Sequence, residues 1–450
     1  MNLYWQNDEA LIKVYDGIDN LALEGQLRPI VFIIATNRKF DFTSFEQSLL
    51  DSLKSSAICK TKGLIHLFIG DNNFIPSKNT CDFLSVKRVK MDSHELNKKD
   101  DIGCIRQFQR KLAREACENF EDPILVIMDD DLSFESLMLH NGQLQLGYPF
   151  SYVHEIYNFS TQFECDVALG SVTGSPPLPA TSCMRTFLQD FLSAEVPQNN
   201  SENWNESDYY YDLSETRTNW SAWKIIQKPD INQNDAEYFL NQMFFTCSNN
   251  RPLIITQLPS DKVPYETVTR GGNTVIFNSK YITEIVHPKL PRRGDSIWSI
   301  LALEKNAKIL KFSAPLYHDR GNETYDNSNL KQRMIDDIFG ASLQRAMLQN
   351  LDDFEKILSD RINRQLEMID DCLRLINLIE NTYPIKRGII GTFWGLSKKE
   401  QRLFINTAKR ELVCLKNHLI HYSLSICENV EKGTILAKSL RYDLAKVMIK

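Results

Sequence analysis

Three adjacent aspartates follow the most apolar segment of the sequence. The run "PILVIM", residues 123–128, is followed at once by Asp129, Asp130 and Asp131. Neighbouring carboxylates repel one another unless solvent or a cation screens their charge. Mg²⁺ and Mn²⁺ prefer oxygen ligands and commonly bridge from carboxylates to substrate phosphates. In an extended chain Asp129 and Asp131 point to one side and Asp130 to the other, so the triplet predicts a divalent-cation site for a nucleoside diphosphate derivative.

A structural alternative is a solvated acidic turn that caps a helix after the strand, since aspartate is a good N-cap residue. Two other polar segments favour the functional interpretation. Residues 36–38 end the apolar run 29–36, and residues 71–73 follow the apolar run 64–70. If these runs are neighbouring parallel strands, the three polar ends meet at one edge of a sheet, where ligands bind in such folds.

The segments between these runs indicate the architecture that positions the polar ends. Helix-like segments at 43–56 and 100–120 separate the apolar runs, and residues 84–91 alternate as an edge strand does. Ser44 and Gln47 have the spacing of a capping box for the first of these helices. Continuous apolar strands separated by helix-length segments indicate an α/β fold with a mostly parallel sheet and right-handed crossovers.

Composition limits the other possibilities. The net charge of −6 gives no indication of a broad nucleic-acid-binding surface. The ten cysteines include no Cys-x-x-Cys pair, so reduced core residues are expected rather than a zinc site. The start "MNLYWQNDEA" resembles no signal peptide, and no apolar run is long enough to span a bilayer. A cytoplasmic setting is therefore the expectation.

The pattern divides the chain into three parts. Residues 1–27 are polar and are expected to be irregular, residues 28–328 alternate between strand-like and helix-like segments, and residues 329–450 are helical in pattern. Residues 195–235 are rich in Asn, Ser, Tyr and Trp and predict a long surface loop or lid. The Gly and Pro content of residues 168–182 predicts a rigid loop.

The order of four motifs resembles that of nucleotide-sugar glycosyltransferases of the A-type fold (GT-A), and is most similar to family 2 and its relatives. The motifs are "VFIIATNR" from residue 31, "LFIGDNN" from residue 67, "RQFQRKLA" from residue 106 and "VIMDDD" from residue 126. The resemblance covers residues 28–320, and its strongest match is the Asp-x-Asp motif after the strand. It implies a Rossmann-like GT-A domain, a nucleotide-sugar donor such as a UDP- or GDP-sugar, and Mn²⁺ or Mg²⁺ as cofactor.

The resemblance also implies roles for individual residues. Asp129 would contact the ribose of the donor, Asp71 would read its base, and Asp131 would bind the metal. The residues implied in donor binding are Thr36, Asn37, Arg38, Asp71, Arg106, Asp129, Asp130, Gly271 and Gly272. The implied metal ligands are Asp129, Asp131 and His318.

Later segments carry the remaining roles, each beside a structural alternative. Gly271 and Gly272 let the backbone approach a ligand closely, or form a hairpin turn. Asp295 precedes an apolar helical run and would be the general base of an inverting reaction, or the N-cap of that helix, or both. His318 follows an apolar strand and would complete the metal site, or be an ordinary structural histidine. Arg320, or the pair at 292–293, would bind the diphosphate.

The last part of the chain reads as a separate helical module. Apolar residues recur at spacings of three and four over 362–376 and over 404–422, which predicts an antiparallel hairpin or bundle. Ser397 and Glu400 have capping-box spacing for the second helix. Core packing is the simplest role, and homodimerisation or acceptor recruitment remains open. The basic, apolar and aromatic segment 386–395 also leaves shallow membrane contact open.

The expectation is thus a metal-dependent glycosyltransferase. It would move a sugar from a nucleotide sugar to a glycan or other hydroxyl acceptor, with inversion, in polysaccharide or glycoconjugate synthesis. Two alternatives stay open. One is a metal-dependent nucleotidyltransferase on a related sheet, and the other is a non-catalytic nucleotide-binding scaffold.

Overall fold

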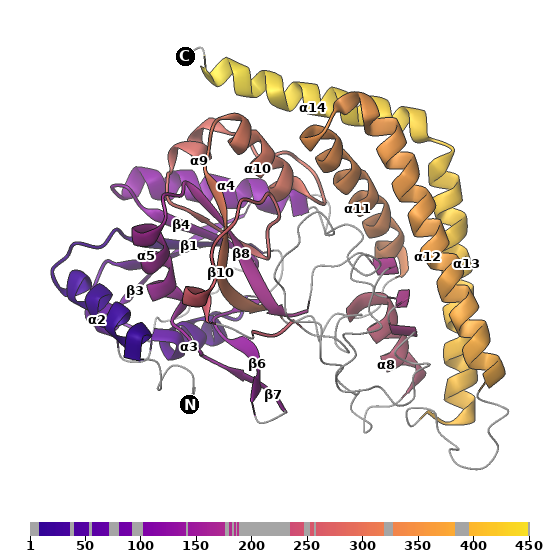
Figure 1. The fold of residues 1–450 in the computed structure, drawn as a ribbon, viewed down its shortest axis with the longest axis horizontal. Coiled ribbons are helices and arrows are strands. Elements are labelled where there is room, and N and C mark those ends of the chain that lie inside the picture. The colour runs from indigo at the N-terminus through magenta and orange to yellow at the C-terminus, as the bar shows by residue number, and fades with distance from the viewer. Residues whose placement is uncertain are drawn as a thin grey trace. The chain divides into compact units, whose positions relative to one another are not determined.

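The computed structural model describes most of the chain. The described residues are 9–36, 40–53, 56–71, 81–91, 102–140, 143–175, 180–181, 184–185, 187–188, 235–246, 253–255, 258–318, 327–382 and 396–448. They form two compact units, shown in Figure 1. The sheet unit comprises residues 1–173, 254–318 and 439–450, and the helical unit comprises 174–253 and 319–438. The division differs from the predicted boundaries, because the described residues 9–27 belong to the sheet unit and those described between 174 and 253 belong to the helical unit.

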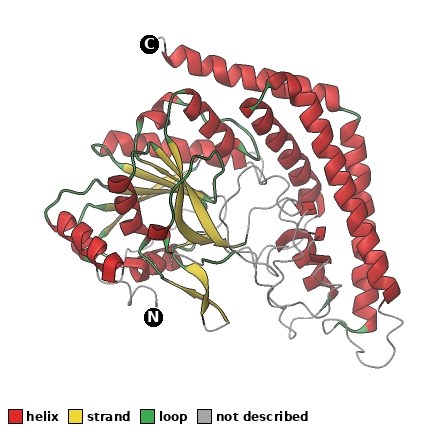
Figure 2. Ribbon diagram, in the orientation of Figure 1, coloured by secondary structure: helices red, strands yellow, loops and turns green. Residues whose placement is uncertain are grey.

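The sheet unit is built on one eight-stranded sheet, drawn in yellow in Figure 2. The strand order is β3-β2-β1-β4-β9-β8-β10-β5. The strands are β1 (Ile30–Thr36), β2 (Ile65–Asp71), β3 (Leu84–Lys90), β4 (Ile124–Met128), β5 (Leu132–Ser133), β8 (Val167–Gly174), β9 (Asn273–Ile276) and β10 (Ile309–His318). Every residue of β1, β2 and β4 is buried, as their continuous apolar sequences predict.

The first four strands of this order run parallel, and β3 is an edge strand, as predicted. In this register Thr36 pairs with Asp71, so the polar ends of β1 and β2 lie side by side. Beyond β4 the strands are no longer all parallel, since β9 runs antiparallel to both β4 and β8. The short strand β5 pairs antiparallel with the end of β10. The sheet is therefore mixed, with its parallel half at the predicted strands.

Helices cover both faces of this sheet in Figure 1. The helices α4 (Ile102–Asn119), α9 (Lys280–Glu284) and α10 (Gly294–Glu304) lie on one face. On the other are α2 (Glu9–Leu23), α3 (Phe42–Leu53) and α5 (Tyr152–Gln162). The short turn η1 (Ala57–Lys60) contacts α2 and α3. The helix α3 begins before the predicted capping box at residue 44, and the side chain of Asp41 accepts hydrogen bonds from the Ser44 amide and hydroxyl. Asp41 therefore caps this helix.

Three further expectations were wrong. Residues 9–23 are helical rather than irregular, because Tyr15, Ile18 and Ala22 recur at helical spacing and are buried. Much of the expected rigid loop at 168–182 is strand β8. No helix follows the aspartates, since β5 and then the hairpin β6 (Ser136–His140) and β7 (Gln143–Gly147) come next. The aspartates therefore do not cap a helix.

The helical unit contains α8 (Ala236–Asn241), α11 (Asn327–Leu348), the turn η6 (Leu351–Asp353), α12 (Phe354–Thr382), α13 (Lys398–Ser423) and the first part of α14 (Ile426–Met448). The predicted antiparallel hairpin is confirmed, since Glu380 pairs with Lys409 and Asp370 with Lys416 across α12 and α13. Ser397 caps α13 by accepting from the Glu400 amide at 3.2 Å. The Glu400 carboxylate instead accepts from the amide of Ala236. None of the described helices is long and apolar enough to cross a membrane.

Candidate functional site

The three aspartates lie where the parallel half of the sheet ends. The amide of Asp129 donates to the carbonyl of Gly272 at 3.1 Å, which ties the end of β4 to the start of β9. The hydroxyl of Thr36, at the end of β1, donates to a carboxylate oxygen of Asp130. Asp71, at the end of β2, is only 5% exposed and neighbours Thr36 in the sheet. The predicted polar ends of three strands are thus brought together.

Asp131 lies against a residue from the other end of the domain. Nε2 of His318 is 3.3 Å from Oδ2 of Asp131. The pairing of β10 with β5 causes this proximity, because His318 is in register with Leu132, the residue after Asp131. The imidazole is 8% exposed and the carboxylate 23% exposed, so both groups are largely buried. Two of the three predicted metal ligands are therefore neighbours.

Asp129, the third predicted ligand, is bound by two arginines. Nη2 of Arg106, on α4, lies 2.5 Å from Oδ1 of Asp129. Nη2 of Arg270, which precedes β9, lies 2.8 Å from the same oxygen. Burial opposes the charged state of Arg106, but the carboxylates of Asp129 and Asp295 outweigh it and raise the pKa of the guanidinium. Arg106, predicted for donor binding, is thus a buried cation beside the aspartates.

The same two arginines also bind Asp295. Nη1 of Arg270 is 2.8 Å and Nε of Arg106 is 3.1 Å from Oδ2 of Asp295. Nη2 of Arg110 lies 3.8 Å from Oδ1. Burial alone would raise the pKa of Asp295, but Arg270, Arg106 and His287 hold it well below its ordinary value. The predicted base and the predicted donor-binding aspartate therefore share their counter-ions.

Asp295 does not cap its helix, so that structural alternative was wrong. The N-cap of α10 is Arg293, which adopts a left-handed conformation at φ 64°, and Asp295 lies in the first turn. A carboxylate in the first turn is stabilised by the helix dipole. The Asp295 carboxylate makes no cap hydrogen bond and instead contacts Arg270 and Arg106.

His287 and Arg110 complete the surroundings of Asp295. Nε2 of His287 is 3.2 Å from Oδ1 of Asp295, and its Nδ1 is 3.0 Å from the carbonyl oxygen of Pro288. Both oxygens only accept, so the ring makes both hydrogen bonds only when it is protonated. Burial lowers the pKa of His287, against the opposing effect of Asp295. Burial also lowers the pKa of Arg110 to about 9, and its guanidinium stacks 4.0 Å from the Trp298 ring.

The two predicted glycines shape the backbone around these charges. A Cβ on Gly271 would lie 2.6 Å from the carbonyl oxygen of Gly170, and Gly272 has φ +75°. Both positions therefore require glycine. The carbonyl of Gly272 accepts from the Asp129 amide and, at 2.6 Å, from Nη2 of Arg270. The glycines thus hold Asp129 and Arg270 together, and their contact with a donor stays a prediction.

Some predicted residues lie outside the described part of the chain: Asn37, Arg38, Arg320, the segment 386–395 and most of 195–235. Conversely, sequence reasoning missed Arg270, Arg110 and His287. Arg110 had a usable signal, because it stands four residues after Arg106 and shares its helix face. Arg270 had a weaker one, since it directly precedes the two glycines.

Some of the predicted metal ligands are placed where they could bind a divalent metal. Within the described ranges, no group of three or more His, Cys, Asp or Glu side chains is gathered closely enough to hold a metal ion. Asp131 and His318 nevertheless offer a carboxylate oxygen and an imidazole nitrogen side by side. Mg²⁺ and Mn²⁺ commonly take few protein ligands and complete their coordination with waters and substrate phosphates. A metal held by Asp131 and His318, with donor phosphates as further ligands, therefore fits these residues.

Comparison with known proteins adds no further constraint. No protein-family model matches the sequence, and no curated protein matches it significantly. The chemistry of the site is therefore inferred from the residues themselves.

Proposed function

We propose that the chain is a metal-dependent glycosyltransferase with a GT-A-type fold, transferring a sugar from a nucleoside diphosphate sugar to a hydroxyl acceptor. The observation that carries the proposal is the pair Asp131 and His318, 3.3 Å apart, beside an aspartate held by two arginines. The first pair offers atoms that could bind a metal, and the two arginines offer hydrogen-bond donors for phosphate oxygens. A metal-bound diphosphate would use both kinds of group.

The position in the fold supports the proposal. Open α/β sheets bind ligands beyond the carboxyl ends of their parallel strands, where the strand order reverses. Here β2 and β3 follow β1 on one side, and the chain then crosses to place β4 on the other side, so the strand order reverses at β1. Thr36, Asp71 and Asp129 stand at the ends of these three strands. The donor nucleotide would lie across them.

The reaction assigns each group a task. The acceptor oxygen bonds to the anomeric carbon of the sugar while the bond from that carbon to the diphosphate oxygen breaks. The acceptor proton passes to Asp295, and the nucleoside diphosphate leaves. A bound Mn²⁺ or Mg²⁺ would supply Lewis-acid stabilisation of that leaving group. Arg106 and Arg270 would add hydrogen bonds to its phosphate oxygens.

Donor binding would also prepare Asp295 to act as base. While Arg106 and Arg270 bind Asp295, its pKa is held well below the ordinary value, so it accepts a proton poorly. A donor diphosphate would compete for the same two guanidinium groups. Weaker contacts to Asp295 would raise its pKa toward the range a base needs. Proton transfer would then depend on donor being bound.

The first experiment is a thermal-shift series with UDP, GDP, CDP and their sugars, with and without Mn²⁺. Ligands that bind only the folded state raise Tm by mass action. We expect one nucleoside diphosphate to raise Tm in a metal-dependent way, and Asp131→Asn to lose the metal dependence while remaining folded. The matched control is Asp122→Asn, an exposed aspartate at φ 45° paired with Arg28, which asparagine tolerates.

Other outcomes redirect the assignment. Pyrophosphate released from a nucleoside triphosphate would indicate the nucleotidyltransferase alternative. A folded protein that shows no metal-dependent response to nucleotides would indicate a non-catalytic scaffold. The control Asp122→Asn separates a specific loss from a general loss of stability. Homodimerisation through the helical unit stays a prediction that the same sample tests by light scattering.

A further inference from the structure

Helix α13 has apolar side chains on two opposite faces. One face is buried within the helical unit and consists of Phe404, Ile405, Ala408, Leu412, Leu415 and Leu419. The other face carries Leu403, Val413, Ile420 and the C-cap residue Leu424, which are 42% to 77% exposed. A surface helix that only completes the core of its own domain needs one apolar face. The second face of α13 therefore calls for a different explanation.

The residues of this exposed face recur at alternating spacings of three and four. We call them the α13 seam: Leu403, Asn406, Arg410, Val413, Asn417, Ile420 and Leu424, all of them exposed. This spacing is the sequence pattern of a coiled-coil interface. Apolar residues that are exposed singly are common on protein surfaces, but they do not follow a heptad. The spacing therefore predicts a second helix lying along α13.

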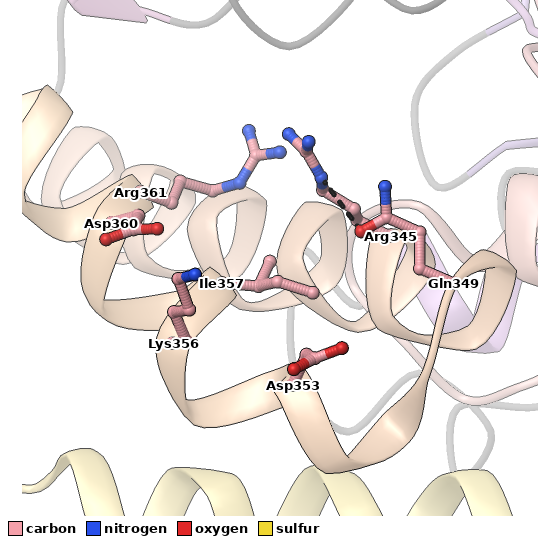
Figure 3. A pocket seen from close by; sticks show the side chains of 7 residues that line it. All are labelled: Arg345, Gln349, Asp353, Lys356, Ile357, Asp360 and Arg361. Atoms are coloured by element: carbon pink, nitrogen blue, oxygen red, sulfur yellow. Dashed lines mark hydrogen bonds between the residues drawn. The ribbon is translucent and has the colours of Figure 1, made fainter.

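The surface around the start of α12 differs from the α13 seam. The cavity there is lined by Ile357 and by six polar residues, which include Lys356 and Asp360 (Figure 3). Covering polar groups without pairing them costs free energy. An apolar helix would therefore gain little at this cavity, and a helical partner is expected at the α13 seam instead.

We propose that a second copy of this chain binds along the α13 seam, with the two α13 helices antiparallel. One antiparallel register places Leu403 opposite Ile420 of the partner subunit and Asn406 opposite Asn417 of the partner subunit. Apolar side chains then meet apolar side chains, and each asparagine amide meets another amide with which it can exchange hydrogen bonds. The arrangement is two-fold symmetric, as an isologous dimer requires.

The charge of Arg410 decides the orientation of the two helices. Its side chain is 73% exposed and lies in the middle of the seam. Parallel helices in register would place it opposite Arg410 of the partner subunit, and like charges repel. The antiparallel register places it opposite Val413 of the partner subunit, which the aliphatic part of the arginine covers while the guanidinium stays in water. Antiparallel pairing therefore avoids this direct repulsion.

Charges beside the seam are complementary in the same register. Lys409 pairs with Glu380, and Lys416 pairs with Asp370, along the side of α13 that faces α12. The register places Lys409 opposite Lys416 of the partner subunit, and each of these lysines has a carboxylate of its own subunit beside it. Each subunit therefore presents charges of both signs to the other along this side, which favours pairing of two copies.

Sedimentation velocity on the full chain tests whether the dimer exists. At micromolar concentrations we expect a species of twice the 52.1 kDa mass of the chain, in exchange with the monomer. A monomer at every concentration would overturn the proposal. All residues of the seam belong to the helical unit, and the measurement needs no nucleotide or metal. Its outcome is therefore independent of the transferase function.

A variant in the seam shows whether the dimer forms there. Ile420→Glu should raise the dissociation constant of the dimer about a hundredfold, because two-fold symmetry places a charge opposite Leu403 at two positions. The matched control is Leu348→Glu, an exposed leucine at the end of α11 that lies outside the seam. It should dimerise as the wild type does. Retention of the dimer in Ile420→Glu, or an equal loss in both variants, would overturn the proposal.

Two double variants test the antiparallel register. Asn406→Glu with Asn417→Lys places opposite charges against each other in that register and should dimerise at least as tightly as the wild type. Asn406→Lys with Asn417→Lys places like charges against each other and should weaken the dimer about tenfold or more. Parallel helices would bring identical residues together, so equal weakening in both double variants would overturn the antiparallel arrangement. Circular dichroism confirms that each variant is folded.

Discussion

The guanidinium of Arg270 lies 2.8 Å from the carboxylate of Asp129. Its other Nη atom lies 2.8 Å from Asp295, and Arg106 contacts the same two carboxylates. Two aspartates with separate expected roles are therefore linked by common counter-ions. A ligand that draws the arginines away from one carboxylate must change the electrostatic environment of the other. This arrangement makes Arg270 the most informative residue to change.

Arg270→Lys should weaken donor binding. The lysine ammonium is a single donor centre and cannot bridge two carboxylates or two phosphate oxygens as a guanidinium does. A lost charge-assisted hydrogen bond costs about 1.5–3 kcal/mol, which corresponds to a tenfold to hundredfold rise in Kd. Titration calorimetry with the donor nucleotide measures this. Arg114→Lys is the control, since Arg114 is an exposed residue of α4 that donates to the Ile282 carbonyl. An equal loss in both variants would reject the role of Arg270.

Asp295→Asn should greatly slow transfer without weakening donor binding. Asparagine keeps the shape of the side chain and one acceptor oxygen, but its amide nitrogen cannot accept the hydrogen bonds that the second carboxylate oxygen accepts, and the side chain cannot take up a proton. General-base catalysis typically contributes about 10²–10⁴-fold, so kcat should fall by that order. The Kd for the donor should not rise, because the variant removes the negative charge that competes for Arg106 and Arg270. Single-turnover assays separate the two quantities. Wild-type turnover in the variant would remove Asp295 from the mechanism, and lost donor binding would make it a positioning residue.

Asp295→Asn should also change how the free energy of unfolding depends on pH. The folded-state pKa of Asp295 is held well below its ordinary value of 3.8. Its ion pairs therefore stabilise the folded state above pH 3.8, and this stabilisation is lost as the pH falls through the lower folded-state pKa. Asp295→Asn should therefore be less stable than the wild type at pH 7, and the difference should shrink only in strong acid. Urea unfolding at a series of pH values measures this.

Two glycines in different surroundings, Gly271 before β9 and Gly17 in α2, allow a matched pair of alanine variants. Gly271→Ala should destabilise the fold, because its Cβ would lie 2.6 Å from the backbone oxygen of Gly170. Moving backbone costs more than moving a flexible side chain, and a loss of about 1–3 kcal/mol is expected. Gly17→Ala, in helix α2, meets nothing within 4 Å and should instead stabilise by about 0.5–1 kcal/mol. Chemical unfolding compares the two, and equal effects would contradict the geometry.

Sequence reasoning located the elements whose signal is local. The strands β1, β2 and β4 are continuous apolar runs, and α4, α12 and α13 have strong helical periodicity. These patterns depend only on which faces each element buries. The helix α2 was missed because its buried face carries only a few apolar residues, such as Tyr15 and Ile18, in a polar segment. Its burial is visible only once its packing partner is known.

The sequence predicted the aspartates at the strand ends. It did not predict that Arg270 and His287 would contact Asp295. Asp129 and Asp131 are marked by the strand that precedes them. Arg270 and His287 reach Asp295 through turns around β9 and before α10, and no spacing in the sequence encodes that approach. Neither could the sequence reveal that one pair of arginines serves both Asp129 and Asp295. Non-local charge pairing of this kind follows from tertiary packing alone.

Glu155 should make the stability of the sheet unit pH-dependent. Burial raises the pKa of this carboxyl to about 7, against hydrogen bonds from Tyr15 and Asn158 that lower it. The folded state therefore favours the neutral acid, and stability should fall as the pH rises from the ordinary pKa of 4.5 to about 7, then level off. Each pKa unit corresponds to about 1.4 kcal/mol.

Glu155→Gln tests this directly, because glutamine imitates the neutral acid and keeps an oxygen for the Tyr15 hydroxyl. The variant and the wild type should have similar free energies of unfolding at pH 5, and the variant should be more stable at pH 8. The neighbouring pair of Asp19 and His154 is present in both proteins, so their difference isolates Glu155. Glu118→Gln, at an exposed position on α4, should show no such trend. A constant difference between pH 5 and pH 8 would mean that Glu155 is charged throughout, and that the helix α2 docks onto a carboxylate rather than onto a neutral acid.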